Sequence, residues 1–422
     1  MTALIILSYR RLKDLKLIII LLVNVKGYKL LYLIKKGMKK NKLNALLERM
    51  KKVSVDAIVI RNAENILFAT GYWPVIGWSL LVVKSDGSSR LLVPDSEIKF
   101  ITGKEADEIE WLNRESLSEV FNPYKKIKSF LENSKIRENS RIGCELSFET
   151  IASLHSGGEV SFANFPTFEL LRKLTNGTLV DFSSELQELR EVKDEEEIEK
   201  IKVACEIAAF GLEAGFSSLR EGVSEAELAS TIESEIYSKG IGYKGVKRVR
   251  GFAFVMSGVN GSEAYLPFDI SSDKKIKKGE SILIELNTYA DGFWSDITRT
   301  WFLGEPEERL KSIYNAIYEA TEKAVLEAKA GSKASEVDSI ARNFLASKGI
   351  TSEFNHRLGH GVGFRLHEPP NLHPFSNDII KANSTFTIEP GAYGPNFGIR
   401  IEDVVLATKD KGIKLGNVPL EF

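Results

Sequence analysis

The sequence predicts an α/β protein of two domains, the second of which carries an internal duplication. A chain of 422 residues is long enough for two or three domains, and its 43% hydrophobic and 27% charged residues are typical of a soluble globular protein. Short apolar runs alternate with helical patterns over residues 54–185, and a twenty-residue segment occurs twice beyond residue 190. These observations place the domains at residues 38–188 and 189–422, with residues 1–37 outside them.

The first domain shows strand and helix patterns but no residues that suggest chemistry. Residues 57–60 form a compact apolar run, AIVI, which predicts a strand. The segment SLLVVKSDGSSRLLVP (79–94) predicts a hairpin that turns at Asp86 and Gly87, and FELLRKL (168–174) predicts a helix. This alternation is typical of an α/β domain.

Charge and cysteine content indicate which binding partners and which cellular compartment to expect. The net charge is −1, but residues 1–40 hold ten basic residues and one acidic residue, so they carry +9 and the rest carries −10. An acidic body argues against nucleic acid as a partner. Cys144 and Cys205, the only cysteines, provide neither a disulfide framework nor a zinc cluster, which is typical of the reducing cytoplasm.

Residues 1–37 contain the most apolar run of the chain, LIIILLV at 17–23. Seven residues are too few to cross a bilayer, which takes about 20, so no membrane span is expected. We expect an extension outside the fold, or a true start at Met38; a weak membrane-surface anchor is the alternative.

The second domain contains the repeat. Residues 222–241 and 331–350 align without gaps and are identical at seven of twenty positions, including the closing Ser-Lys-Gly-Ile. Each copy ends in Lys-Gly, a signal for a helix C-terminus, so each predicts an amphipathic helix. The acids at 194–197 predict the start of an earlier helix. Two generic amphipathic helices would explain the match; the alternative is a duplicated domain with pseudo-two-fold symmetry.

Pairs of acids after each copy favour the duplication. The segment ESILIELNTYADGFWSDITRTWFLG (280–304) predicts a hairpin turning near residues 290–292, with Glu285 and Asp296 as near neighbours across the strands. The segment STFTIEPGAYGPNFGIRIEDVVLAT (384–408) predicts a second hairpin turning at 394–396, with Glu389 and Glu402 placed in the same way.

Four of the five histidines lie within eighteen residues, in HRLGHGVGFRLHEPPNLH at 356–373. Imidazole is the commonest metal ligand, and glycines around His360 let the backbone approach a ligand closely. Four buried acids need compensation, which two divalent cations would provide with His360 as a fifth ligand. Such an oxygen-rich set suits Mn²⁺, with Co²⁺, Fe²⁺ or Zn²⁺ as alternatives. Ion pairs with Arg299, Arg365 and Arg400 are the other explanation for the acids.

Four ordered motifs resemble those of the proline-directed metallopeptidases, the family of aminopeptidase P and prolidase, with methionine aminopeptidase as a more distant relative. They are DGFWSDITRT (291–300), HRLGHGVGFRLHE (356–368), TIEPGAY (387–393) and GIRIEDVVLAT (398–408), and ENILFATGY (64–72) is similar to the start of the family's amino-terminal domain. The resemblance covers about residues 54–422. It implies a creatinase-like amino-terminal domain, a pseudo-symmetric pita-bread catalytic domain, a homodimer, and a proline-containing peptide as substrate.

The resemblance implies a role for each matching residue. The implied ligands of two divalent metal ions are Glu285, Asp296, His360, Glu389 and Glu402. Asp296 and Glu402 would bridge both ions, His360 and Glu389 would complete one, and Glu285 the other. A water bridged by the ions would attack the carbonyl.

Four residues have implied roles toward the water and the substrate. Glu389 would shuttle the proton of the attacking water, and His367 would contact the substrate carbonyl. His356 would line the pocket for the residue after the scissile bond. Arg400 matches an arginine that the family holds near the site.

Two positions depart from the family pattern. Glu285 stands where the family normally has aspartate, so the second metal would be displaced or weakly held. Phe268 replaces a histidine that lies near the substrate in the family, which puts the substrate class in doubt. His373 matches no family role and is expected in a loop. The alternatives are therefore a weakly active or non-catalytic homologue that binds peptide or protein in the same pocket, and a metal-free C–N hydrolase of the creatinase type.

Overall fold

The computed structural model describes residues 4–5, 21–24, 27–29, 38–75, 78–112, 124–147, 165–266, 271–416 and 418–420. The chain forms two compact units, one made of Met1–Ser147 with Ser161–Ser183 and the other containing Ser184–Phe422. Within 1–37, the described residues are the backbone of three short strands, β1 (Leu4–Ile5), β2 (Leu21–Asn24) and β3 (Gly27–Lys29), paired in the order β1-β2-β3. No helix among the described residues is long and apolar enough to span a membrane.

The first unit is built on a mixed six-stranded sheet of order β7-β6-β5-β4-β8-β9. Its strands are β4 (Ala57–Ile60), β5 (Leu80–Lys84), β6 (Ser89–Pro94), β7 (Glu108–Leu112), β8 (Arg141–Cys144) and β9 (Thr178–Asp181). Its helices are α1 (Lys40–Lys52), α2 (Ala63–Thr70), the 3-10 helix η1 (Asp95–Phe100), α3 (Tyr124–Asn133) and α4 (Phe165–Thr175). The antiparallel pairing of β5 with β6 confirms the predicted hairpin, and α4 confirms the helix predicted at 168–174.

The core of this unit lies between its sheet and helices α3 and α4. Val59, Leu80 and Leu92 from the sheet pack with Ile127 and Phe130 of α3, and all five side chains are fully buried. Burial of this apolar surface stabilises the unit, since each such side chain contributes about 1.5–3 kcal/mol.

The second unit repeats one order of elements. After α5 (Ser183–Glu191), the first half contains α6 (Glu195–Ser218), α7 (Glu225–Gly240), the short η3 (Tyr243–Gly245) and η4 (Asn260–Glu263), and the sheet β10 (Val249–Ser257), β11 (Ser281–Ala290) and β12 (Phe293–Phe302). The second half contains α8 (Glu308–Glu327), α9 (Ala334–Ser347), and strands β13 (Gly359–Gly361), β14 (Glu368–Leu372), β15 (Thr385–Ile388), β16 (Gly391–Gly394), β17 (Phe397–Arg400), β18 (Asp403–Ala407) and β19 (Gly412–Lys414).

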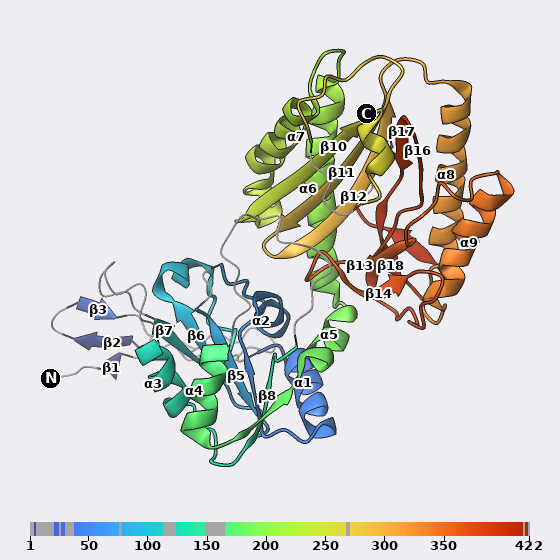
Figure 1. Ribbon diagram of the computed structural model, residues 1–422. Coiled ribbons are helices and arrows are strands. Elements are labelled where there is room, and N and C mark those ends of the chain that lie inside the picture. Colours follow the sequence, from blue (N-terminus) through green and yellow to red (C-terminus); the bar gives the residue numbers. More distant parts are fainter. Residues whose placement is uncertain are drawn as a thin grey trace. The chain divides into compact units, whose positions relative to one another are not determined.

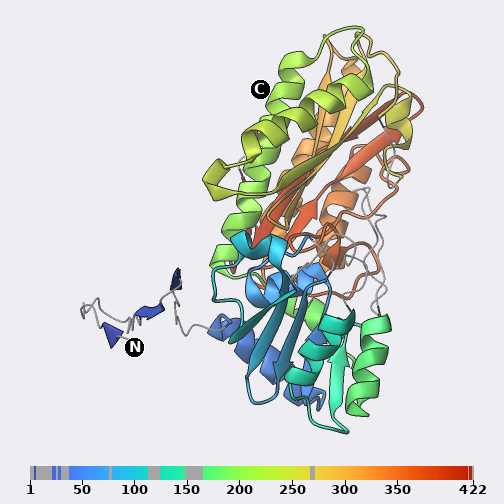
Figure 2. The same cartoon turned by 90° about the vertical axis from the view of Figure 1, so that its left-hand side faces the viewer.

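Each half places a pair of helices on antiparallel strands. Helices α6 and α7 contact the sheet β10-β11-β12 (Figures 1 and 2), and α8 and α9 contact the strands of the second half, paired as β14-β13-β15-β18-β19 and β16-β17. The two copies of the sequence repeat form α7 and α9. The repeat therefore corresponds to a repeated order of helices and strands, as the duplication predicts.

Local signals explain where these helices begin. Asp194 caps α6 and Ser224 caps α7, and in each case a glutamate three residues later, Glu197 or Glu227, completes a reciprocal capping box. Such a cap contributes about 1 kcal/mol because it satisfies backbone N–H groups that have no partner in the helix.

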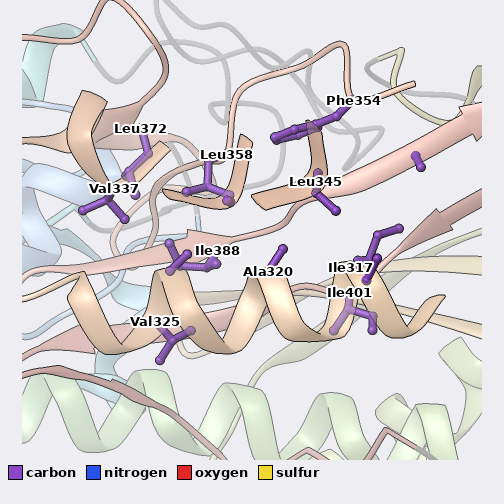
Figure 3. Close-up of a cluster of buried hydrophobic side chains, with 14 of the residues drawn as sticks. Ile317, Ala320, Val325, Val337, Leu345, Phe354, Leu358, Leu372, Ile388 and Ile401 are labelled. Carbon is purple, nitrogen blue, oxygen red and sulfur yellow. The ribbon is translucent and has the colours of Figure 1, made fainter. Parts of the chain in front are cut away.

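A large apolar core holds the second half together (Figure 3). Ile317, Ala320 and Val325 of α8 pack with Ile388, the last residue of β15, and with Ile401, which lies between β17 and β18, and all are buried. Val337 and Leu345 of α9 pack in the same cluster. The core thus fixes the strands next to Glu389 and Glu402.

Candidate metal centre

The first hairpin places Asp296 opposite an asparagine. Strands β11 and β12 are joined at Asp291 and Gly292 and pair along their whole length, so that Asp296 faces Asn287 and Glu285 faces Thr298. Glu285 and Asp296 are thus diagonal neighbours. Asn287 Nδ2 donates a hydrogen bond to Asp296 Oδ1 at 2.6 Å, and both side chains are buried.

The second hairpin brings Glu389 and Glu402 face to face. Ile388 pairs with Asp403 and Gly391 pairs with Arg400, so Glu389 and Glu402 occupy the facing positions between two short ladders. Their carboxylates accept hydrogen bonds from threonine hydroxyls, Thr387 Oγ1 to Glu389 at 3.0 Å and Thr298 Oγ1 to Glu402 at 2.6 Å. Because Thr298 belongs to β12, its hydroxyl links the two hairpins.

His360 lies on β13 between the two pairs of acids. Its Nε2 is 3.5 Å from Asp296 Oδ2 and 3.4 Å from Glu389 Oε1. Its Nδ1 is 3.1 Å from the carbonyl oxygen of Gly361, a contact that favours the proton on Nδ1 and leaves the Nε2 lone pair facing the carboxylates. The flanking glycines serve strand packing, because a Cβ on Gly359 or Gly361 would clash with the carbonyl of Thr387 or Pro369. These two glycines thus allow close approach between backbones, and their expected close approach to a ligand stays a prediction.

Two groups of ligand atoms come close enough to share an ion. Asp296, His360 and His367 form one group and His360, Glu389 and Glu402 form the other, with all donor atoms within 4.8 Å of one another in each. The imidazole rings of His360 and His367 lie 4.2 Å apart between centroids. His367 was assigned only to the substrate by sequence, and the structure adds it to the set of residues that can reach an ion.

Glu285 belongs to neither group. Its carboxylate accepts a hydrogen bond from Arg400 Nη2 at 2.6 Å, and its side chain is 29% exposed. Pairing with arginine was the other explanation offered for the four acids, and the structure shows it for Glu285. Arg299, by contrast, pairs with Asp403 at 2.6 Å. The metal-ligand role of Glu285 stays a prediction.

Burial and mutual repulsion make this cluster costly without a cation. Burial raises the pKa of Asp296 and Glu402 well above the usual range, and neighbouring carboxylates raise both further. Burial likewise raises the pKa of Glu389 to about 7, and burial lowers the pKa of His360 well below its usual value. A neutral imidazole and three crowded carboxyl groups fit a divalent cation, since a cation would replace the protons that hold the cluster together.

A chain of polar contacts extends from Arg400 to His356. Arg400 Nη1 donates to the hydroxyl of Tyr393 at 2.9 Å, and that hydroxyl is 3.0 Å from His356 Nε2. Burial lowers the pKa of His356 to about 3 and raises that of Tyr393 to about 12, so both are neutral near pH 7. Sequence reasoning assigned no role to Tyr393, although it lies inside the TIEPGAY motif.

Arg357, also missed by sequence, is a largely buried guanidinium whose pKa is lowered by burial and raised by the charges of nearby acids, Glu389 first. His373 lies in the loop after β14, where its Nδ1 accepts a hydrogen bond from the backbone of Phe375, as expected for a residue outside the site. Phe268 lies outside the described residues.

Comparisons with known proteins agree with this geometry. A sequence model described as metallopeptidase family M24 matches residues 199–409, and one described as the creatinase/prolidase N-terminal domain matches residues 42–192. A Xaa-Pro dipeptidase from Pyrococcus horikoshii is 33% identical over 382 residues, which are 90% of this chain and 98% of that relative.

The chain belongs to metallopeptidase family M24. Solved structures support the same fold. The prolidase from Pyrococcus horikoshii OT3 aligns with a TM-score of 0.72 and 30% identity over 90% of this chain and 99% of that one. The X-Pro aminopeptidase from Thermotoga maritima aligns with a TM-score of 0.70 and 28% identity over 90% of this chain and 98% of that one.

The M24 assignment confirms the fold predicted from sequence, a creatinase-like amino-terminal domain followed by the pseudo-symmetric catalytic domain. The residues that carry the four M24-like motifs converge on one place in the second unit, as the positions of Asp296, His360, Glu389 and Glu402 show. Members of this family use divalent metals, and this chain has kept a group that can hold them.

Proposed function

We propose that the protein hydrolyses the peptide bond before proline, as a metal-dependent Xaa-Pro dipeptidase or Xaa-Pro aminopeptidase. The observation that carries the proposal is the convergence of Asp296, Glu389 and Glu402 on His360, at the meeting of two hairpins in an M24 chain. Relatives named Xaa-Pro dipeptidase match almost their whole length, which supports the substrate class.

Two divalent ions are the proposed cofactors. Asp296, His360, Glu389 and Glu402 would hold them, and Mn²⁺ suits these donors best, with Co²⁺, Fe²⁺ or Zn²⁺ as alternatives. When bound, such ions lower the pKa of water and polarise a carbonyl. Glu285, the fifth ligand expected from the resemblance, accepts a hydrogen bond from Arg400 through one carboxylate oxygen in the structure.

We propose that Glu389 carries the proton of the attacking water. Its carboxylate lies 3.4 Å from His360 Nε2 among the proposed ligands, where it can accept a proton from water and return it, as a general base and acid must. The hydroxyl of Thr387 donates to Glu389 Oε1 at 3.0 Å and so orients the oxygen that lies 3.4 Å from His360 Nε2.

Substrate binding falls to the histidines and to Arg400. We propose that His367, beside His360, contacts the substrate carbonyl and that His356 lines the pocket for the residue after the scissile bond. Tyr393 holds the ring of His356 on one side and Arg400 on the other, so the three side chains form one preorganised wall. Phe268 is also proposed to lie near the substrate, because it stands where the resembling family has a histidine close to the substrate.

Assembly and location are also proposals. The resemblance supports a homodimer, and the two cysteines, both free and buried, support a cytoplasmic protein.

The test is hydrolysis of Ala-Pro by the full chain, stripped with a chelator and reloaded with Mn²⁺. We expect proline release from Ala-Pro and none from Ala-Ala, which has no bond before proline. A longer peptide such as Ala-Pro-Ala, assayed in parallel, distinguishes a dipeptidase from an aminopeptidase. Failure to cleave any of these proline peptides in the presence of Mn²⁺ would refute the proposal.

One observation favours a second candidate, a weakly active or non-catalytic homologue that binds peptide in the same pocket. Glu285 stands where the family normally has aspartate, and one of its two carboxylate oxygens is paired with Arg400, which would weaken its hold on a metal ion. Bound Mn²⁺ after dialysis together with measurable turnover of Ala-Pro would exclude this candidate. Peptide binding without metal and without turnover would establish it.

A further inference from the structure

Arg357 is a charged residue beside the metal centre that the proposed function does not use. It lies between His356 and Leu358, in the segment that leads into β13. Its Nη1 donates a hydrogen bond to Asn371 Oδ1 at 3.1 Å. Asn371 is directly opposite His360 in the ladder of β13 and β14, so these two side chains share one face of the sheet. The guanidinium of Arg357 therefore lies on the face that carries His360.

The charges of the site and of Arg357 act on one another. Burial lowers the pKa of Arg357, and the charges of three site carboxylates, Glu389 first, raise it. Burial raises the pKa of Glu389, and the charges of Arg400 and Arg357 oppose that rise. Coulomb interactions of this kind weaken with distance, so these mutual effects agree with a guanidinium beside the cluster.

Arg357 has no acidic partner of its own among the residues that the structure describes. The hydrogen bond to Asn371 is the one that its side chain makes there, and the side chain is not fully buried. The other site arginine, Arg400, is paired with Glu285. Arginine has five N–H donors in a fork that fits the two oxygens of a carboxylate. Arg357 therefore has donors left for an anion that comes from outside the chain.

The acids of the cluster are poor candidates for that anion. Asp296, Glu389 and Glu402 are the proposed ligands of two divalent ions, whose charge exceeds what three carboxylates can balance. In the loaded site the acids would thus no longer compensate Arg357. A further negative charge, brought by the substrate, would do so.

We propose that Arg357 binds a carboxylate group of the peptide substrate and makes the site selective for peptides that carry one next to the scissile bond. This inference rests on the proposed function. A dipeptide such as Ala-Pro carries a C-terminal carboxylate on its proline, and Glu-Pro carries another in the side chain before the scissile bond. His356, proposed to line the proline pocket, is the neighbour of Arg357, which favours the C-terminal carboxylate.

The test compares peptides that differ only in one charged group, cleaved by the Mn²⁺-loaded full chain. Ala-Pro is paired with its amide, Ala-Pro-NH₂, and Glu-Pro is paired with Gln-Pro. Arg357→Met should lower kcat/KM about 10–100-fold for the charged member of one pair, mainly through KM, and less than about 3-fold for the neutral member. A selective loss in the first pair assigns the C-terminal carboxylate, and one in the second pair assigns the side chain. Bound Mn²⁺, measured by metal analysis, should not change.

Two variants serve as controls. Arg357→Lys keeps the charge and should retain part of the selectivity, whether or not the methionine variant folds. Lys348→Met removes an exposed positive charge after α9 and should affect both members of each pair alike.

Equal losses for the charged and neutral members of both pairs in Arg357→Met would overturn the inference. Cleavage of none of these peptides by the wild type would overturn the proposed function and the inference with it. The two failures are therefore distinguishable.

Discussion

Arg299 is the residue whose removal should most damage the frame of the metal centre. Its side chain is 1% exposed and donates hydrogen bonds to five acceptors, which are the carbonyls of Thr298, Glu402, Val418 and Pro419 and the carboxylate of Asp403. It thereby connects residues 418–420 with the strand that begins next to a proposed ligand. Arg299→Met keeps the apolar volume and removes all five bonds.

The expected cost is about 4 kcal/mol of the free energy of unfolding. Loss of one partner from a buried ion pair costs about 3–5 kcal/mol because a charge stays buried without compensation. Lys414 Nζ, 2.9 Å from the other oxygen of Asp403, keeps the cost below the upper limit. Since Arg299 also fixes the carbonyl of Glu402, Mn²⁺ affinity should fall about 10–100-fold.

The assay is urea unfolding of the metal-free chain, followed by tryptophan fluorescence, with Mn²⁺ titration of the same samples. Lys239→Met is the control, since it breaks a surface pair with Glu235 whose loss should change the free energy of unfolding far less than Arg299→Met does. The double change Arg299→Met with Asp403→Asn should recover part of the loss, because the unpaired charge is removed with it. A cost below about 1.5 kcal/mol for Arg299→Met would refute the reasoning.

Three further predictions concern stability. Lys193→Met should cost about 3–5 kcal/mol in urea unfolding, because the buried ammonium lies 2.7 Å from Glu368, the neighbour of His367; a change within 1 kcal/mol would contradict this. Burial raises the pKa of Glu145 to about 7 in the folded state, against about 4.5 unfolded, so stability present below pH 4.5 should fall by up to about 3 kcal/mol as the pH rises to 7. Glu145→Gln should flatten that pH profile, and a profile parallel to the wild type would count against the cause. Ile388→Ala should cost about 2–5 kcal/mol and Ile388→Val about 0.5–1.5, since the side chain is fully buried beside Glu389; equal costs would show that no cavity forms.

Much of the fold follows from short-range signals. The Asp-Gly turns at 86–87 and 291–292 and the caps at Asp194 and Ser224 each depend on a few neighbouring residues, and the structure contains all of them. The repeat also indicated the order of elements in the second unit, because both copies fold into equivalent helices.

The site was only partly accessible from sequence. Glu389 and Glu402 face one another as the second hairpin predicts, but its ladder is interrupted beside both residues, where β15 gives way to β16 and β17 to β18. In the first hairpin, counting outward from the turn at 291–292 pairs Asp296 with Asn287, a signal that attention to the acids alone misses.

Contacts between residues far apart in the sequence could not be predicted from sequence patterns. Glu285 and Arg400 are 115 residues apart, and Tyr393 and His356 are 37 apart, so their pairing depends on how separate segments of the chain pack. Turn residues and strand register predict which residues face each other within one strand pair. They do not predict which of several nearby side chains will form a hydrogen bond or ion pair in the folded site.

We propose that cations held at Asp296, His360, Glu389 and Glu402 give this chain its Xaa-Pro peptidase activity. The most direct measurement follows bound Mn²⁺ and Ala-Pro hydrolysis in one titration of the chelator-stripped protein, with His360→Ala alongside. We expect no proline release before Mn²⁺ is added, a rate that rises with bound Mn²⁺, and loss of both tight binding and activity in His360→Ala. Hydrolysis that is complete without metal, or full Mn²⁺ loading with no proline released, would contradict it.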